Sequence, residues 1–317
     1  MAVQNSLKLD GVTEVYPGFT TTPGGGKTFL VHNLGASALS DLPAGFAGNP
    51  DGFFQSVQAA LNACRLGRGD KVILLPGHVE SVSTANFWSS IGTVPTCSDV
   101  EIVGVGTGSN RPSFTWTTAA SSILFNAANI KLRNVRLFLA GAHAAGSALT
   151  VAAPISITAD GCEITDCEIA YGFQANRIVS IGITTTAAAT RFNFSRNDVY
   201  AETIAVPTTT FLRLTGTDFF RMDDTRIVGP GSTTAIGPVQ MLTTASLKIQ
   251  LNRTTIQNTI AASTVAFTTI AGCTGTINSG GLGVLAGTQA ITTGSGLQAV
   301  GSASQSIIGV QSLLATT

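Results

Sequence analysis

Five eight-residue segments in the middle of the chain share one pattern: IKLRNVRL (130–137), CEITDCEI (162–169), FNFSRNDV (192–199), FRMDDTRI (220–227) and IQLNRTTI (249–256). Positions one, three and eight are apolar in every copy. The alternation at positions one and three is strand periodicity, because successive side chains of a strand point to opposite faces. These segments therefore predict strands with one buried and one exposed face.

The series continues in both directions at nearly constant spacing. Val72-Ile-Leu74 and Val100-Glu-Ile102 add two copies upstream, and Ile277 with Val284 gives a poorer eighth copy downstream. The successive intervals are 28, 30, 32, 30, 28, 29 and 28 residues. No long amphipathic helix lies between copies, so a βαβ fold is disfavoured. We predict an all-β fold, a single-stranded right-handed parallel β-helix of about eight turns, each about 4.8 Å from the next.

We expect the coil to span 49–285 and to begin with a capping helix at 50–66. Asn49-Pro50-Asp51 is a helix-start signal, with proline at the first helical position, and Gly67 is a stop signal. One face of this helix carries Phe53, Val57, Ala60, Leu61 and Cys64. The helix can then plug the apolar end of the coil. Residues 1–48 lie outside the repeat, and we interpret them as an N-terminal arm or particle anchor.

The outward positions carry charges that we expect to stack from turn to turn. Position five reads Asp166, Arg196, Asp224 and Arg253, and position seven reads Arg136, Glu168, Asp198 and Arg226. Opposite charges on neighbouring strands attract and like charges repel. The pattern assigns most acidic and basic residues of the middle of the chain to structural ladders.

Composition excludes several classes of function. Charged residues are only 11% of the 317, and 17 Lys and Arg balance 17 Asp and Glu, so no basic patch points to nucleic acid. The stretch 137–159 has no charge but is interrupted by polar residues, so we expect no membrane span. The start, MAVQNSLKLDGV, lacks the apolar core of a signal peptide, which favours synthesis in a cytoplasm. Five cysteines without paired CxxC spacing indicate reduced, buried thiols.

The last 64 residues, 254–317, contain none of the 34 charged residues. A neutral surface rich in Ala, Ser, Thr and Gly can be covered by identical copies without burying unpaired charge. We interpret 286–317 as an oligomer or particle contact segment. The alternative is a low-complexity terminal strand on a monomer.

Three stretches together resemble a known superfamily: DGFFQSVQAALNACRLGRGDKVILLPGHV (51–79), DVEIVGVGTG (99–108) and ANIKLRNVRLF (128–138). They are similar to the opening of the pectin-lyase-like right-handed β-helix superfamily, and the resemblance covers roughly residues 50 to 285. That superfamily includes polysaccharide lyases, hydrolases and many bacteriophage tailspikes and other virion proteins. The resemblance implies the fold, whereas the same fold hosts many activities.

The sequence contains no complete active site. A hydrolase of this fold would need two carboxylates about 5–9.5 Å apart, and a lyase would need a carboxylate cluster for calcium with an Arg or Lys base. Asp218 and Asp223 are the only weak catalytic or calcium candidates, since Asp166, Glu168 and Asp224 belong to the ladders. His32, His78 and His143 are far apart and share no position of the repeat, so we predict no metal site, and we expect no cofactor.

Three hypotheses remain for the function. The first is a non-enzymatic bacteriophage virion protein, a capsid decoration, cement or head-fibre protein that forms a homotrimer and binds a major capsid protein. The second is a tailspike or fibre that binds or degrades bacterial surface polysaccharide. The third is a carbohydrate-active enzyme or adhesin outside any virus.

Overall fold

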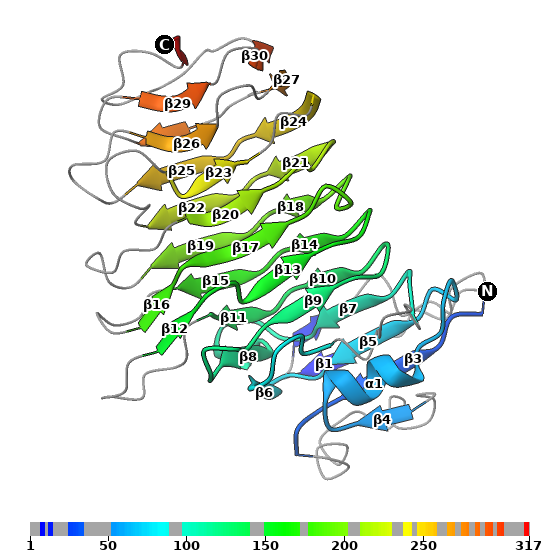
Figure 1. Cartoon of the computed structure of the whole chain (residues 1–317). Helices are drawn as coiled ribbons and strands as arrows, with labels where there is room; N and C mark the ends of the chain where they lie inside the picture. Colours follow the sequence, from blue (N-terminus) through cyan, green and yellow to red (C-terminus); the bar gives the residue numbers. More distant parts are fainter. Residues whose placement is uncertain are drawn as a thin grey trace.

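The chain is a β-solenoid built from three parallel sheets that run along the coil (Figure 1). The computed structural model describes residues 7–9, 12–14, 25–34, 52–88, 97–139, 149–171, 177–201, 210–229, 237–242, 246–258, 265–269, 274–278, 283–285, 289–293, 297–300 and 314–316. Within them, the three long sheets have 11, eight and eight strands. The predicted all-β class and parallel stacking are confirmed.

Most neighbouring strands within a sheet come from successive turns of the coil. In spatial order, the first sheet contains β30 (Leu297–Val300), β27 (Thr274–Asn278), β24 (Ser246–Asn252), β21 (Phe220–Asp223), β18 (Asn193–Ser195), β14 (Glu163–Thr165), β10 (Lys131–Arg133), β7 (Glu101–Gly104), β5 (Lys71–Leu74), β3 (Thr28–Val31) and β4 (Gly52–Phe54). The second contains β28 (Gly283–Leu285), β25 (Thr255–Asn258), β22 (Arg226–Gly229), β19 (Asp198–Ala201), β15 (Glu168–Tyr171), β11 (Arg136–Phe138), β8 (Ser113–Trp116) and β6 (Val79–Val82). The third contains β31 (Leu314–Thr316), β29 (Gln289–Thr293), β26 (Val265–Thr269), β23 (Val239–Met241), β20 (Thr210–Leu214), β17 (Ile181–Thr185), β13 (Ile155–Ile157) and β9 (Ile123–Phe125).

The remaining elements are short. Strands β12 (Leu149–Val151) and β16 (Arg177–Val179) form a parallel pair, and β1 (Leu7–Leu9) and β2 (Val12–Glu14) form an antiparallel one. Among the described residues, the helices are α1 (Val57–Ala63) and the 3-10 turn η2 (Gly108–Asn110).

Identical positions of successive repeats lie side by side in the first sheet. Leu132 pairs with Ile102 on one side and with Ile164 on the other, and Ile164 pairs with Phe194. All four side chains are fully buried in one continuous hydrophobic core. The apolar positions one and three therefore face inward, as predicted.

Each octet forms two strands joined by a corner, where the sequence pattern alone predicts one strand. Position five is the corner, and its residues adopt the left-handed region: Asn134 (φ 54°), Asp166 (59°), Arg196 (56°), Asp224 (50°) and Arg253 (45°). Asn and Asp adopt this region more readily than other residues with a side chain. The corner turns the chain from the first sheet into the second, so positions six to eight begin a new face of the coil.

Polar side chains at position six hold adjacent corners together. Asn197 donates from Nδ2 to the carbonyl of Ile164 at 2.9 Å, and its Oδ1 accepts the Cys167 N–H at 2.9 Å. Thr225 and Thr254 hydroxyls donate to carbonyls of the preceding turn at 3.2 and 2.9 Å. Buried backbone groups at the bend are satisfied in this way, which an apolar side chain could not achieve.

The capping helix is shorter than predicted and starts later. The predicted start at Asn49 lies outside the described residues, and residues 52–54 form β4, which pairs with β3. Ser56 is the true N-cap, because its hydroxyl accepts the Ala59 N–H at 3.3 Å, and the helix ends at Ala63. Val57, Ala60 and Leu61 are buried in the core at the N-terminal end of the coil (Figure 1), so the predicted plug is present.

Two carboxylates fasten this plug. Buried Asp70 accepts the N–H groups of Lys27 and Arg65, both at 2.8 Å, and the Arg68 guanidinium. Burial acts to raise the pKa of Asp70, but these hydrogen bonds outweigh it and lower the pKa. Glu80 Oε2 accepts the Val57 N–H at 3.0 Å at the first turn of the helix.

Two predicted boundaries need correction. Strand β3 lies within the supposed arm 1–48 but pairs with β5, and β29, β30 and β31 extend the sheets into 286–317. The number of turns also differs slightly from the predicted eight: the longest sheet stacks 11 strands, and the other two stack eight each. Val72 lies beside Ile102 instead of Val100; because the strand period is two, this shift of two residues keeps Val72 inside.

We predict that Ile164→Asp prevents folding, because it places an unpaired charge among fully buried side chains, at a cost of more than about 4 kcal/mol. The matched control is Glu163→Ala, on the outer face of the same strand, which should change the free energy of unfolding by less than about 1 kcal/mol. Chemical denaturation monitored by circular dichroism measures both. Similar unfolding curves for the two variants would contradict the inward and outward assignment.

Candidate functional site

A polar groove runs over the outer face of the first sheet, across β5, β7, β10 and β14. It consists of two cavities of about 540 and 750 Å³ that share Lys71, Glu101 and Arg133 in their walls. Successive strands lie about 4.8 Å apart, so the groove crosses the turns along the coil axis. We call this feature the outer groove.

An alternating charge ladder lines the outer groove at position two of the repeat. Lys71 pairs with Glu101 at 3.5 Å, and Lys131 pairs with Glu163 at 3.0 Å. Arg133 also reaches Glu101 at 3.0 Å. This ladder was not predicted from the sequence, although its signal is the alternation of Lys and Glu at one repeat position.

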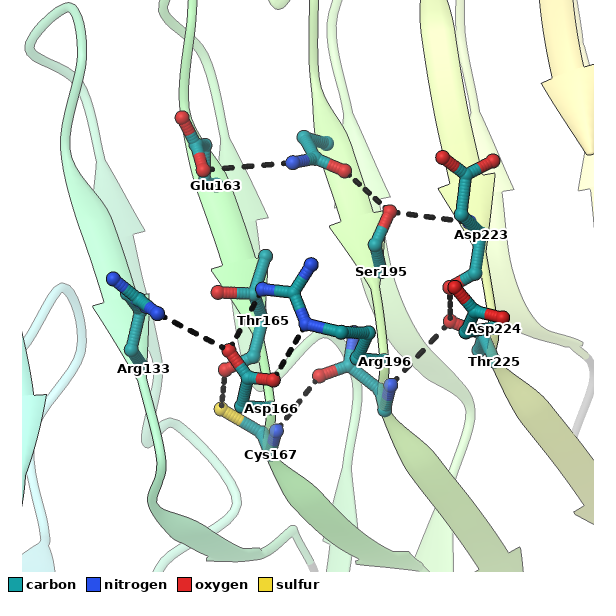
Figure 2. A network of polar contacts seen from close by, with 12 residues as sticks. Arg133, Glu163, Thr165, Asp166, Cys167, Ser195, Arg196, Asp223, Asp224 and Thr225 are labelled. Carbon is teal, nitrogen blue, oxygen red and sulfur yellow. Dashed lines mark hydrogen bonds and ion pairs between the residues drawn. The ribbon is translucent and has the colours of Figure 1, made fainter. Parts of the chain in front are cut away.

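The position-five ladder is confirmed. Arg196 binds both carboxylate oxygens of Asp166, at 2.7 and 2.8 Å, and Arg133 lies 3.6 Å from the same carboxylate (Figure 2). Arg253 binds Asp224 in the same two-point manner, at 2.5 and 2.6 Å. Burial acts to raise the pKa of Asp166, but the bonds from Arg196 and the nearby charges lower it.

The position-seven ladder is present with one break in its alternation. Arg136 pairs with Glu168 at 3.1 Å, and Arg226 pairs with Asp198 at 2.8 Å. Glu168 and Asp198 are direct neighbours in register and have the same charge. The Tyr200 hydroxyl donates to Glu168 at 2.7 Å, which partly compensates for this repulsion.

The two weak catalytic candidates lie at opposite ends of one strand. Asp218 precedes β21 and Asp223 is its last residue. A strand rises about 3.3 Å per residue, so β21 alone puts about 10 Å between the two positions. They do not form a pair of carboxylates around a common substrate atom.

Each candidate also has structural partners. Asp218 Oδ1 accepts the N–H of Phe219 and of Lys248, both at 2.9 Å. Asp223 is only 4% exposed, and its Oδ2 forms an ion pair with Arg221. Its N–H donates to Ser195, whose hydroxyl donates to Asn193, which in turn reaches Glu163 (Figure 2). Asp223 Oδ1 is buried without a hydrogen-bond partner.

His32 and His78, which share no position of the repeat, are brought together beneath the plug. Their ring centroids are 6.2 Å apart, and both rings are buried. His78 Nε2 lies 3.0 Å from Glu80 Oε2, while His78 Nδ1 and Glu80 Oε1 have no hydrogen-bond partner. His143 lies outside the described residues. The sequence does not predict the histidine pair, because the two residues are brought together by the stacking of turns and not by their spacing in the sequence.

The thiols of the described residues are free and buried. Burial raises the pKa of Cys97 to about 11 and the pKa values of Cys162 and Cys167 to about 12. A thiol that stays protonated is a poor nucleophile and metal ligand. These side chains act as small core residues, as predicted for Cys162.

Two further features are absent from the part of the chain that the structure describes. Its residues hold no group of three or more His, Cys, Asp or Glu arranged to bind a metal ion. Among them, no helix has the length and apolar character needed to cross a membrane.

No protein-family model, no curated protein and no solved structure matches this chain. The site must therefore be interpreted from its own geometry.

We predict that stability falls as pH decreases from 7.5 to about 5.5, because of His32. Burial lowers the pKa of His32, the electrostatic effect of the neighbouring His78 ring lowers it further, and the hydrogen bond to Pro76 opposes both. Its Nδ1 also accepts the Leu34 N–H at 3.2 Å, a bond that protonation would break. Below about pH 6.5 the imidazole of His32 takes up a proton in the unfolded chain, whereas in the folded chain it does so only at lower pH. Acid therefore favours unfolding. Thermal melting across this range should show a smaller pH dependence in His32→Gln, and equal pH dependence would contradict this assignment.

Proposed function

We propose that the protein is a non-enzymatic structural component of a bacteriophage particle, a capsid decoration, cement or head-fibre protein. The observation that carries the proposal is the set of ion-pair ladders on the outer face. Most outward carboxylates of the ladders are engaged with Arg or Lys of the adjacent turn, as in Asp166 with Arg196 and Asp224 with Arg253. Such a surface supports a rigid rod and leaves little free acid–base chemistry.

The solenoid supports a role in assembly through its two ends. Its sheets continue through β29, β30 and β31, in the part of the chain that contains no charged residue. An uncharged surface can be buried between identical copies without desolvating ions. Closed cyclic symmetry is the usual solution for such self-association. We propose a homotrimer, by analogy with the phage β-helix proteins that the sequence resembles, made in the host cytoplasm and bound to a major capsid protein.

The outer groove favours a second candidate, a tailspike or fibre that binds or degrades bacterial surface polysaccharide. Its walls carry charged and amide groups suited to a hydrophilic ligand. A panel of bacterial polysaccharides incubated with the purified protein separates the two proposals. Release of reducing ends or unsaturated sugars, abolished by Asp223→Asn or Asp218→Asn, would replace the structural proposal with this one.

We predict that the full-length protein is a trimer by light scattering and binds purified, undecorated capsids. Deletion of residues 2–24 should leave the trimer and the fold intact but abolish capsid binding, because it removes β1 and β2 and spares β3. Deletion of 301–317 removes β31, the described strand of that segment, and should shift the protein to monomers or aggregates. A stable, soluble monomer at micromolar concentration, for the full-length chain, would overturn the proposal.

A further inference from the structure

We propose that the wider part of the outer groove is an oxyanion site, in which the guanidinium of Arg111 binds a carboxylate or phosphate group of a small hydrophilic ligand. This inference does not rest on the role in a virus particle. It rests on two observations: the balance of charge in the groove, and the lack of an acidic partner for Arg111 among the described residues.

The wider cavity, of about 750 Å³, holds more positive than negative groups. Its walls contain four cationic side chains and three carboxylates: Lys71, Arg111, Arg133 and Arg196 against Glu101, Asp166 and Asp198. The other cavity is balanced, with four of each: Lys71, Lys131, Arg133 and Arg191 against Asp70, Asp99, Glu101 and Glu163. The excess positive charge is therefore confined to the wider part.

Ladder partners neutralise the other charges in the wider cavity. Glu101 is shared by Lys71 and Arg133. Asp166 is shared by Arg196 and Arg133 (Figure 2). Asp198 is bound by Arg226, which does not line the cavity. Among the described residues, no carboxylate of the wall is left to pair with a further cation.

Arg111 is the cation that remains. Its Nε is buried without a hydrogen-bond partner, and no ion pair joins its guanidinium to a carboxylate within the described residues. A buried donor without a partner is destabilising, more so when it belongs to a charged group. A bound oxyanion would supply both the missing acceptor and the missing charge, in the two-point geometry that guanidinium groups favour.

The backbone around Arg111 is held in place by hydrogen bonds. The residue follows η2, and its N–H donates to the Gly108 carbonyl at 3.3 Å. The preceding carbonyl, of Asn110, accepts the Gly77 N–H at 2.7 Å, and the following one, of Pro112, accepts the Arg136 N–H at 2.8 Å. Both flanks are tied to neighbouring turns, so little backbone order needs to be gained when a ligand binds.

More than half of the residues in the same walls are charged. Ile73 and Val105 contribute to the lining but are only 2% and 1% exposed. What a ligand meets is charged side chains, the half-buried Val103, the Asn134 corner and backbone. The Asn134 amide is itself engaged with the Gly104 and Gly106 carbonyls, at 2.8 and 3.2 Å. We therefore infer a small oxyanion with polar substituents, and the experiment distinguishes carboxylate from phosphate.

The test is ligand-dependent thermal melting of the full-length protein, at constant ionic strength, in sodium chloride, sodium phosphate or sodium glucuronate. We expect phosphate or glucuronate to raise the melting temperature of the wild type above its value in chloride. Arg111→Gln should melt no lower than the wild type in chloride, because an unpaired, half-buried charge has been removed, and should lose the ligand-dependent rise. Arg111→Lys, which keeps the charge but not the two-point geometry, should bind about tenfold more weakly in titration calorimetry.

Lys248→Gln is the matched control, because it removes the same charge from an exposed position that does not line the groove. It should keep the full response. A rise with phosphate alone identifies a phosphate site, and a rise with glucuronate alone identifies a carboxylate site. Equal responses in wild type and Arg111→Gln, or no response to either anion, would overturn the proposal.

Discussion

The structure depends on the register between successive turns. A parallel sheet aligns residue with residue, so each outward charge has one defined neighbour above and one below. The same alignment stacks Leu132, Ile164 and Phe194 inside the coil. A slip of one residue would move every apolar side chain to the solvent face. Burial of the core therefore fixes the register, and the register fixes which charges meet.

The corner at position five links the inside of the coil to its surface. Left-handed backbone at Asp166, Arg196 and Asp224 projects these side chains outward from the bend, where they stack as an alternating ladder. One residue later, Asn197 and Thr225 turn inward and bond to carbonyls of the preceding turn. Individual exposed ion pairs contribute only about 0.2–1 kcal/mol each. Their larger effect is that few charges on the outer surface are left unpaired. Arg111, which has no acidic partner among the described residues, is an exception to this pattern.

Much of the fold and part of the site could be predicted from the sequence. The repeat interval and the apolar positions predict the first sheet, because a repeated pattern of period two has one solution when one face is buried. The corner was missed because its residues, Asn134, Asp166 and Arg196, have no common side chain, and only their backbone conformation is shared. Likewise the sequence predicts helix where β4 forms, since Phe53 fits an amphipathic pattern and the pairing with β3 cannot be seen locally. The histidine pair and the Arg111 groove depend on contacts between different turns, which spacing alone does not determine.

The most direct test of the register is to exchange the charges of Asp198 and Arg226 by mutation and to measure the free energy of unfolding of each variant. In this structure Asp198 lies between Glu168 and Arg226, so Arg226→Asp puts three acidic residues in a row and should be destabilising. Adding Asp198→Arg to that variant should restore the stability to the wild-type value or above it, because the new Arg would lie between two carboxylates. A double variant no more stable than Arg226→Asp alone would show that these side chains are not neighbours and would contradict the stacking of turns on which the account rests.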